Sequence, residues 1–350
     1  MKIWVYNYHS GKNQSKEMFQ NPKLGIGDDL MKPFQVLQNQ FKIQWHELFS
    51  ISEYPISEFD AIIFIEWPTL PWIMNSYFNQ ARRLKKRMFL LLMESEIIRS
   101  SNYTQSHHKY FEKIFTWKDD IVDNKKYIKY NWPQNIPEEI VFSDAKNKKL
   151  ITLISSHKLN SHPFELYSER IKAIRYFEEN APTDFDLYGG GWWTISFRSN
   201  LLKYAPLVPG FSYFRELCQK IFFESFPSWK GRINSKKEIL SQYKFAICYE
   251  NAKNIPWYIT EKIFDCFFVG CIPVYLGPPN IDDFIPKNTY IDKNKFPSYA
   301  NLLYFLHNLT DIEITEYQKN IKLFLESEMW RAFSSQSFAK VIVQNIIVAK

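Results

Sequence analysis

The chain has 350 residues, of which 45% are hydrophobic and 18% aromatic, so it carries enough apolar material for two packed domains. Its ten glycines argue against a fibrous or disordered protein. The formal net charge of +7 comes from 44 basic and 37 acidic residues that are mixed along the chain, a balance that suits anionic small molecules as well as nucleic acid.

The first 120 residues alternate short apolar runs with amphipathic stretches. We expect helices at 28–40 and 71–87, and strands at 2–6, 41–48, 61–66, 88–94 and 114–117. This alternation of strand and helix predicts a parallel sheet with helices on both faces.

A stretch rich in Pro, Asn and Lys at 131–149 is the expected linker. A second alternating set follows, with a helix expected at 163–180 and strands at 150–156, 185–189, 245–251, 271–277 and 289–292. The sequence therefore predicts an α/β fold with two Rossmann-like domains that face each other across a cleft.

The C-terminal stretch 329–350 has apolar residues at helical spacing, which favours a core helix over one that lies on a membrane surface. The basic run 82–87 either complements a helix dipole or attracts anionic lipid. The chain begins with a strand-like run and has no apolar run near the roughly 18–20 residues that span a bilayer. We therefore expect a cytoplasmic protein, with peripheral contact at the inner face of the membrane left open.

No metal site is predicted from the sequence. The chain has four cysteines without CxxC or metal-ligand spacing, expected to be buried free thiols: Cys218, Cys248, Cys266 and Cys271. His107 and His108 have no third ligand at metal spacing and are interpreted as surface residues. The Asp-Phe-Asp triplet at 184–186 has the form of a metal–nucleotide motif, but it begins a strand and is interpreted as structural.

The segment 257–279 places a charged triplet ahead of an apolar helix and strand. Thr260 is a good N-cap, and Gly270 suits the C-cap before the strand. The first turn of such a helix offers free N–H groups, so Lys262 is expected to bind a diphosphate and Glu261 to accept hydrogen bonds from ribose hydroxyls. The alternative is that Glu261 only complements the helix dipole and that Lys262 is a solvated surface residue.

The run YKFAICYENAKNIPWYITEKIFDCFFVGCIPVYLGPPNIDDFIPKNTYID at 243–292 closely resembles the donor-binding signature of the α-1,3/4-fucosyltransferases, glycosyltransferase family 10. Three further segments resemble elements of this family in the same order: MESEIIRSSNY (93–103), LYGGGW (187–192) and WKGRINSKKEILSQYKF (229–245). The resemblance covers the chain between about residues 85 and 300.

The resemblance implies a GT-B fold. Its parts would be an N-terminal acceptor-binding domain at 1–145, a C-terminal GDP-fucose-binding domain at 146–325 and a C-terminal helix at 326–350 that packs back on the N-terminal domain. The implied reaction is an inverting transfer of L-fucose from GDP-fucose to a hydroxyl of N-acetylglucosamine or glucose, O3 rather than O4. The implied acceptor is an oligosaccharide or lipopolysaccharide of the Lewis-antigen kind, and no nucleic acid is expected. No tightly bound cofactor is implied, and stimulation by a divalent cation such as Mn²⁺ or Mg²⁺ is left open.

The resemblance also assigns site residues. Glu94 matches the general base, and its place at the end of an apolar strand would put its carboxylate at the sheet edge, where an apolar wall would raise its pKa. The donor-contacting positions are Arg170 on the diphosphate, Lys262 on phosphate, Glu261 on ribose, and Asn251 and Tyr258 lining the pocket. The loop ahead of Arg170 differs in length from the family, which leaves two competitors for its role, Lys158 and Arg175.

Two other functions stay open. The predicted contacts recognise GDP and not the sugar, so a transferase for another GDP-linked deoxysugar fits them equally. A non-catalytic relative that binds a sugar nucleotide is the second alternative. Glu96 and Ser100 stand where the family often has prolines, and this departure bears on the choice of acceptor.

Overall fold

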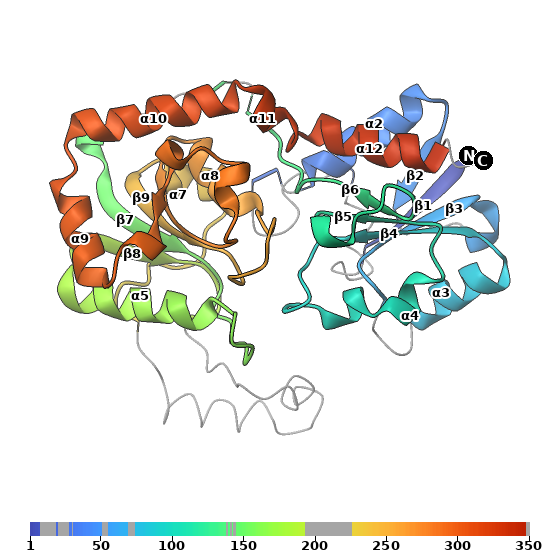
Figure 1. The fold of residues 1–350 in the computed structure, drawn as a ribbon, viewed down its shortest axis with the longest axis horizontal. Coiled ribbons are helices and arrows are strands. Elements are labelled where there is room, and N and C mark those ends of the chain that lie inside the picture. The colour runs from blue at the N-terminus through green and yellow to red at the C-terminus, as the bar shows by residue number, and fades with distance from the viewer. Residues whose placement is uncertain are drawn as a thin grey trace. The chain divides into compact units, whose positions relative to one another are not determined.

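The computed structural model describes residues 1–7, 19, 28–29, 31–50, 55–68, 74–137, 139–140, 142, 145–192 and 226–347. The chain divides into two compact units. Unit 1 comprises Met1–Glu138, Pro256–Glu261 and Phe324–Lys350, and unit 2 comprises Glu139–Ile255 and Lys262–Leu323. Each unit contains a parallel sheet with helices packed against it (Figure 1), so the predicted α/β fold with two Rossmann-like units is confirmed.

The sheet of unit 1 has six strands in the order β2-β1-β3-β4-β5-β6, all paired in parallel. The strands are β1 Lys2–Asn7, β2 Glu47–Ser50, β3 Ala61–Ile65, β4 Arg87–Leu92, β5 Lys113–Thr116 and β6 Tyr127–Lys129. The two central strands, β3 and β4, are almost continuously apolar and buried. Strands covered on both faces by helices have this composition.

Helices cover both faces of this sheet. The helices of this unit are α2 Lys32–Ile43, α3 Met74–Arg83, α4 Gln105–His108, α11 Glu328–Arg331 and α12 Ser335–Ile347. Figure 1 shows α2 and α12 on one side of the sheet and α3 and α4 on the other. The Phe34 and Phe338 rings join α2 to α12, with their centroids 5.9 Å apart. Most of the described apolar residues of the C-terminal stretch therefore belong to the core of unit 1. Among the described helices, none has the length and apolar character needed to cross a membrane.

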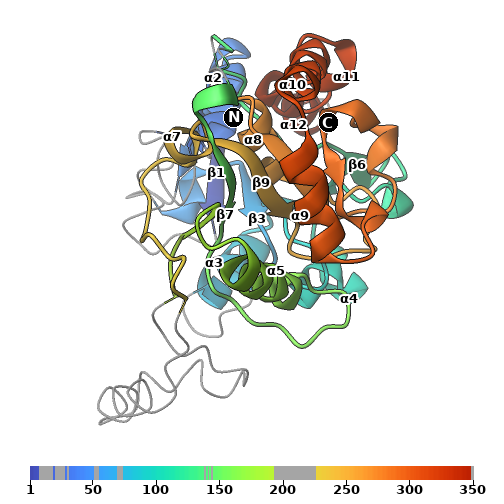
Figure 2. The same cartoon turned by 90° about the vertical axis from the view of Figure 1, so that its left-hand side faces the viewer.

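The sheet of unit 2 has five parallel strands in the order β11-β10-β9-β7-β8. Figure 2 turns this unit toward the viewer, with β7 beside β9. The strands are β7 Lys149–Ile154, β8 Phe185–Tyr188, β9 Tyr243–Tyr249, β10 Ile272–Leu276 and β11 Ile291–Asp292. The helices are α5 Tyr167–Asn180, α7 Lys236–Leu240, α8 Glu261–Phe267, α9 Tyr299–Asn308 and α10 Asp311–Leu325. Side chains from α5 and α9 pack on the sheet in one apolar core.

One expectation about the elements was wrong, and two features had not been expected. The strand expected at 41–48 begins only at Glu47, because α2 continues to Ile43 and buries Phe41. Trp45 then turns the chain with a positive φ of 58°. The short strand β6 and the return of Pro256–Glu261 to unit 1 had not been expected.

His108 is buried, which corrects its interpretation as a surface residue. Its ring nitrogens contact the Tyr127 hydroxyl at 2.9 Å and the Asn102 carbonyl at 2.6 Å. In contrast, Asp186 of the Asp-Phe-Asp triplet has the structural role that was expected, because it pairs with Lys149 at 2.8 Å. Three of the four cysteines are buried and free, as expected, and Cys218 lies outside the described residues.

Candidate functional site

Glu94 follows β4 at the carboxyl edge of the unit 1 sheet, and hydrogen bonds hold its main chain on both sides. Its N–H donates to Glu66 Oε1 at 2.7 Å, and its carbonyl accepts from the Tyr103 hydroxyl at 3.2 Å. The carbonyl of the preceding Met93 accepts from Trp117 Nε1 at 2.8 Å. The loop that carries the predicted base is thus fixed by its neighbours in the same unit.

Tyr258 contacts the Glu94 carboxylate directly. Its hydroxyl donates to Glu94 Oε2 at 3.2 Å, and its ring lies 5.0 Å from the Trp117 ring between centroids. The Tyr258 side chain is fully buried, whereas Glu94 is partly exposed. A hydrogen bond donated to a carboxylate favours its ionised form, which is the form that a base needs. The structure thus brings the predicted base together with one predicted donor residue, in unit 1.

Glu66 lies beneath this loop and had not been predicted. Its side chain is fully buried directly after β3. Burial, together with the negative charge of Glu94, raises the pKa of the Glu66 carboxyl from 4.5 to about 8, against the opposing effect of its hydrogen bonds and Arg99. The sequence held the same signal as for Glu94, a glutamate that ends an apolar strand.

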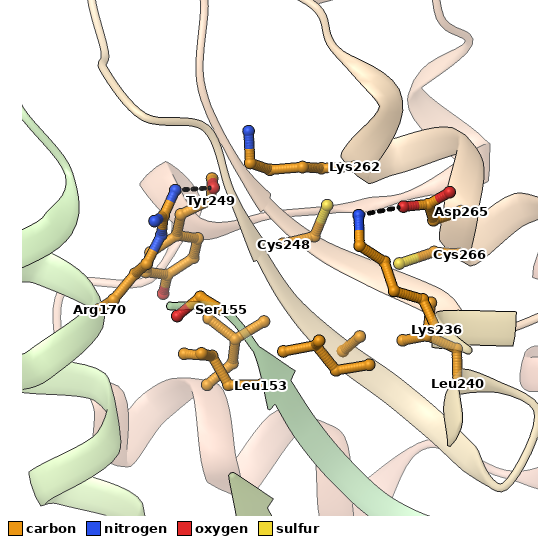
Figure 3. Close-up of a pocket in the computed structure, with 13 residues that line it drawn as sticks. Leu153, Ser155, Arg170, Lys236, Leu240, Cys248, Tyr249, Lys262, Asp265 and Cys266 are labelled. Atoms are coloured by element: carbon orange, nitrogen blue, oxygen red, sulfur yellow. Dashed lines mark hydrogen bonds and ion pairs between the residues drawn. The ribbon is translucent and has the colours of Figure 1, made fainter. Parts of the chain in front are cut away.

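In unit 2 a pocket opens at the carboxyl ends of β7 and β9 (Figure 3). Its lining combines an apolar floor with three basic side chains: Arg170, Lys236 and Lys262. Pockets of this kind, apolar with a few placed charges at the carboxyl edge of a parallel sheet, suit nucleotide diphosphates.

Arg170 is buried on α5 and holds the loop after β9. Its Nη2 lies within donating distance of the Tyr249 carbonyl at 2.7 Å and the Glu250 carbonyl at 2.6 Å. Asn251 Oδ1 also lies 3.1 Å from the same nitrogen. The structure therefore brings the predicted Arg170 and Asn251 together, and the contact of Arg170 with a diphosphate stays a prediction.

Of the two competitors for the role of Arg170, Arg175 is engaged elsewhere. It pairs with Glu178 at 2.8 Å and its guanidinium lies 3.9 Å from the centre of the Phe226 ring. Neither Arg175 nor Lys158 lines the described pocket.

Lys262 is only partly exposed, so its interpretation as a solvated surface residue was wrong. Its ammonium pairs at 2.9 Å with Glu250, whose side chain is fully buried. The second oxygen of Glu250 accepts from the Tyr275 hydroxyl at 3.0 Å. The hydrogen-bonded series Tyr275–Glu250–Lys262 orients the Lys262 ammonium at the pocket. The sequence analysis had not predicted the roles of Glu250 and Tyr275.

A second ion pair lines the pocket and had also been missed. Lys236 on α7 pairs with Asp265 on α8 at 2.7 Å, and both side chains are largely buried (Figure 3). Cys248 lines the same wall, and burial raises the pKa of its thiol, which keeps it protonated. The pair ties α8 to α7 at this wall of the pocket.

Glu261 is the half-buried first residue of α8, and the helix has seven residues. The division between the two units falls between Glu261 and Lys262. The predicted contact of Glu261 with ribose therefore stays a prediction. At the other end of α8, Gly270 has a φ of 65°, as expected for a C-cap.

The glycine run at 189–191 forms a tight turn. Gly189 has a φ of 124°, and a Cβ at this position would lie 1.9 Å from the Ser155 carbonyl oxygen. Glycine is therefore required at position 189, because its main chain packs closely against Ser155, the residue after β7. Among the described residues, no three His, Cys, Asp or Glu side chains form a group that could hold a metal ion.

Comparison with known proteins shows a family similarity within the second half of the chain. Residues 211–337 match the model of "Glycosyltransferase family 10 (fucosyltransferase) C-term". An alpha-(1,3)-fucosyltransferase of Helicobacter pylori is 33% identical over 114 residues, which are 31% of this chain and 23% of that protein. The matched segments span between 20% and 32% of the length of the first curated relatives.

Two solved structures share the fold over nearly the whole chain. A crystal structure of an alpha1,3-fucosyltransferase with GDP-fucose has a TM-score of 0.50 at 15% identity, covering 100% of this chain and 90% of that one. An alpha-glucosyltransferase in complex with UDP and DNA has a TM-score of 0.57 at 13% identity, covering 99% and 100%. The predicted GT-B type of fold is thereby confirmed. Residues 211–337 are thus similar to the C-terminal region of glycosyltransferase family 10, the family that the sequence resembles.

Proposed function

We propose that the protein transfers L-fucose from GDP-fucose to a sugar hydroxyl. The match of residues 211–337 to the family carries this proposal, since that range contains Asn251, Tyr258, Glu261 and Lys262. The placement of Glu94 at the carboxyl edge of a parallel sheet supports it further, because ligands of such folds bind at that edge. The proposal assigns the acceptor to unit 1 and the donor to unit 2.

In the proposed reaction, the acceptor hydroxyl oxygen attacks the anomeric carbon of fucose in line with the leaving group. The bond from that carbon to the β-phosphate oxygen breaks, GDP leaves with the bonding electrons, and Glu94 takes the proton of the hydroxyl. The anomeric configuration inverts because the attack comes from the opposite face. No step of this proposal uses a metal.

The contacts described above give Tyr258 and Lys262 each a task in this scheme. Tyr258 favours the ionised form of Glu94, so the base is ready before the acceptor binds. Lys262 would stabilise the charge that develops on the departing diphosphate, and Glu250 keeps its ammonium in place beforehand. Preorganised charges of this kind lower the barrier because they need no rearrangement during the reaction.

For the acceptor, we propose N-acetylglucosamine or glucose at O3 within a surface glycan such as lipopolysaccharide. The protein would act in the cytoplasm, at the inner face of the membrane where such glycans are assembled. The expected departure from the family at Glu96 bears on this choice, because Lys118 pairs with Glu96 at 2.7 Å and so shapes the loop after Glu94.

The proposal is tested by offering the protein a panel of glycans with GDP-fucose, GDP-mannose or a GDP-linked amino sugar as the donor. We expect transfer from GDP-fucose alone, and a product whose NMR spectrum shows an α-fucosyl group on O3. Transfer from another GDP-sugar would support the rival donor. Binding of GDP without turnover of any donor would support the non-catalytic relative.

A further inference from the structure

Glu66 has a conformation and a location that a structural glutamate rarely adopts. Its φ is 68°, in the left-handed region, and its side chain is fully buried. For a residue with a side chain this backbone conformation costs roughly 1–2 kcal/mol, and a buried carboxyl costs more unless its oxygens are satisfied. Both features persist only where the surrounding structure holds them in place.

The Glu66 carboxyl is satisfied by three N–H donors. Its Oε1 accepts from the main-chain N–H of Met93 at 3.0 Å and of Glu94 at 2.7 Å. Its Oε2 accepts from Nδ2 of Asn102. One carboxyl therefore binds both the start and the end of the loop that carries Glu94.

The Asn102 amide has a fixed orientation. Its Oδ1 accepts from the N–H of Trp67 at 2.9 Å, so its Nδ2 must face Glu66. Asn102 is itself buried in the 3₁₀ turn Ser100–Tyr103. Arg99 closes the loop further by donating to the Trp67 carbonyl at 2.5 Å. The segment 93–103 is thus tied at both ends to two consecutive residues that follow β3.

We propose that Glu66 is a positioning residue that fixes the Glu94 carboxylate for proton transfer, by holding the two ends of the 93–103 loop through Glu94 N–H and Asn102. This inference rests on the proposed function of Glu94 as the base. Glu66 itself does not touch the substrate in this scheme. It sets where the main chain of Glu94 lies, while Tyr258 orients the side chain.

Exchanging the hydrogen-bond donor and acceptor between positions 66 and 102 tests this proposal. In Glu66→Gln, an amide oxygen that accepts from the two main-chain N–H groups leaves the NH₂ group facing the NH₂ group of Asn102, donor against donor, so the side chain cannot satisfy both ends of the loop at once. In the double variant Glu66→Gln/Asn102→Asp, the new amide donates to the new carboxylate, whose other oxygen accepts from Trp67. The double variant therefore restores each of these hydrogen bonds with the same number of non-hydrogen atoms.

We expect Glu66→Gln to lower kcat by about 10- to 100-fold, because displacing a reacting group by about 1 Å has an effect of this size. The KM for GDP-fucose should stay within about twofold, since no GDP contact is changed. The double variant should recover kcat to within about threefold of the wild type. Glu58→Gln, which neutralises an exposed glutamate of the same unit, is the matched control and should match the wild type.

Hydrogen exchange at the main-chain N–H groups of Met93 and Glu94 gives a readout that does not need activity. Exchange there should speed up in Glu66→Gln and return to the wild-type rate in the double variant. Unchanged kcat in Glu66→Gln, or restored exchange without restored kcat, would overturn the positioning role. A wild type that transfers no fucose would refute the proposed function, and with it the catalytic role of the contacts between Glu66 and the 93–103 loop. The exchange rates would still decide whether Glu66 holds the loop.

Discussion

The buried carboxyl of Glu66 should make the stability of unit 1 depend on pH. Burial and the nearby charge of Glu94 raise the Glu66 pKa from 4.5 to about 8. Between these values the folded state keeps a proton that the unfolded state has lost, so the free energy of unfolding falls as the pH rises. Below pH 4.5 the Glu66 carboxyl is protonated in both states and this loss of stability is absent. Above pH 8 the loss has its full size. The shift of about 3.5 pKa units, at about 1.4 kcal/mol each, gives a loss of up to about 5 kcal/mol.

Urea unfolding of the wild type and of Glu66→Gln between pH 5 and pH 9 measures this effect. The unfolding of unit 1 can be followed by hydrogen exchange in peptides from β3 and β4. Titration of other groups is common to both proteins, so the difference between the two curves isolates Glu66, apart from a constant offset for the altered contact with Asn102. The difference should grow in favour of the variant from pH 5 to pH 8 and then level off. Two parallel curves would refute the buried, proton-binding state of Glu66.

Three further substitutions test other contacts. Tyr258→Phe removes the hydrogen bond to Glu94 Oε2, so the pKa of the base should rise and the acid limb of the kcat profile should move to higher pH. An unmoved limb with a raised KM for GDP-fucose would instead place Tyr258 at the donor. Lys262→Ala should weaken GDP binding by roughly 10- to 100-fold and lower the free energy of unfolding by about 3 kcal/mol, because buried Glu250 loses its cation. Adding Glu250→Gln to Lys262→Ala should restore the free energy of unfolding but not the GDP affinity measured by calorimetry. Recovery of both would contradict a contact between Lys262 and phosphate. Gly270→Ala should cost about 1–3 kcal/mol, since φ is 65° and a Cβ would lie 2.5 Å from the Phe142 ring; an unchanged thermal midpoint would show that this turn can relax.

The central strands could be predicted from the sequence because parallel strands that are buried on both faces are continuously apolar. The runs at 61–65 and 88–92 are examples, and they are the strands that place Glu66 and Glu94. Edge strands lack this signal. The three-residue β6 was missed, and β2 was placed too early because Phe41 and Ile43 belong to the end of a helix.

The site could be predicted only in part. Glu94 and Lys262 were predicted from motifs, whereas the contact of Tyr258 with Glu94 joins residues 164 positions apart. That contact depends on the chain returning to unit 1 at Pro256–Glu261, and no local pattern encodes such a return. Glu66 was passed over for another reason. A glutamate at the end of a strand is usually solvated, and only its three buried donors distinguish it from that common case.

The most direct test of the central claim compares the wild type with Glu94→Gln, in fucose transfer and in GDP binding on the same samples. The amide is nearly the same size as the carboxyl but cannot take a proton, so we predict a loss of kcat of about 100-fold or more. Binding of GDP, measured by calorimetry, should stay unchanged, because the donor pocket belongs to unit 2. A Glu94→Gln protein that transfers fucose at the wild-type rate would contradict the assignment of Glu94 as the base.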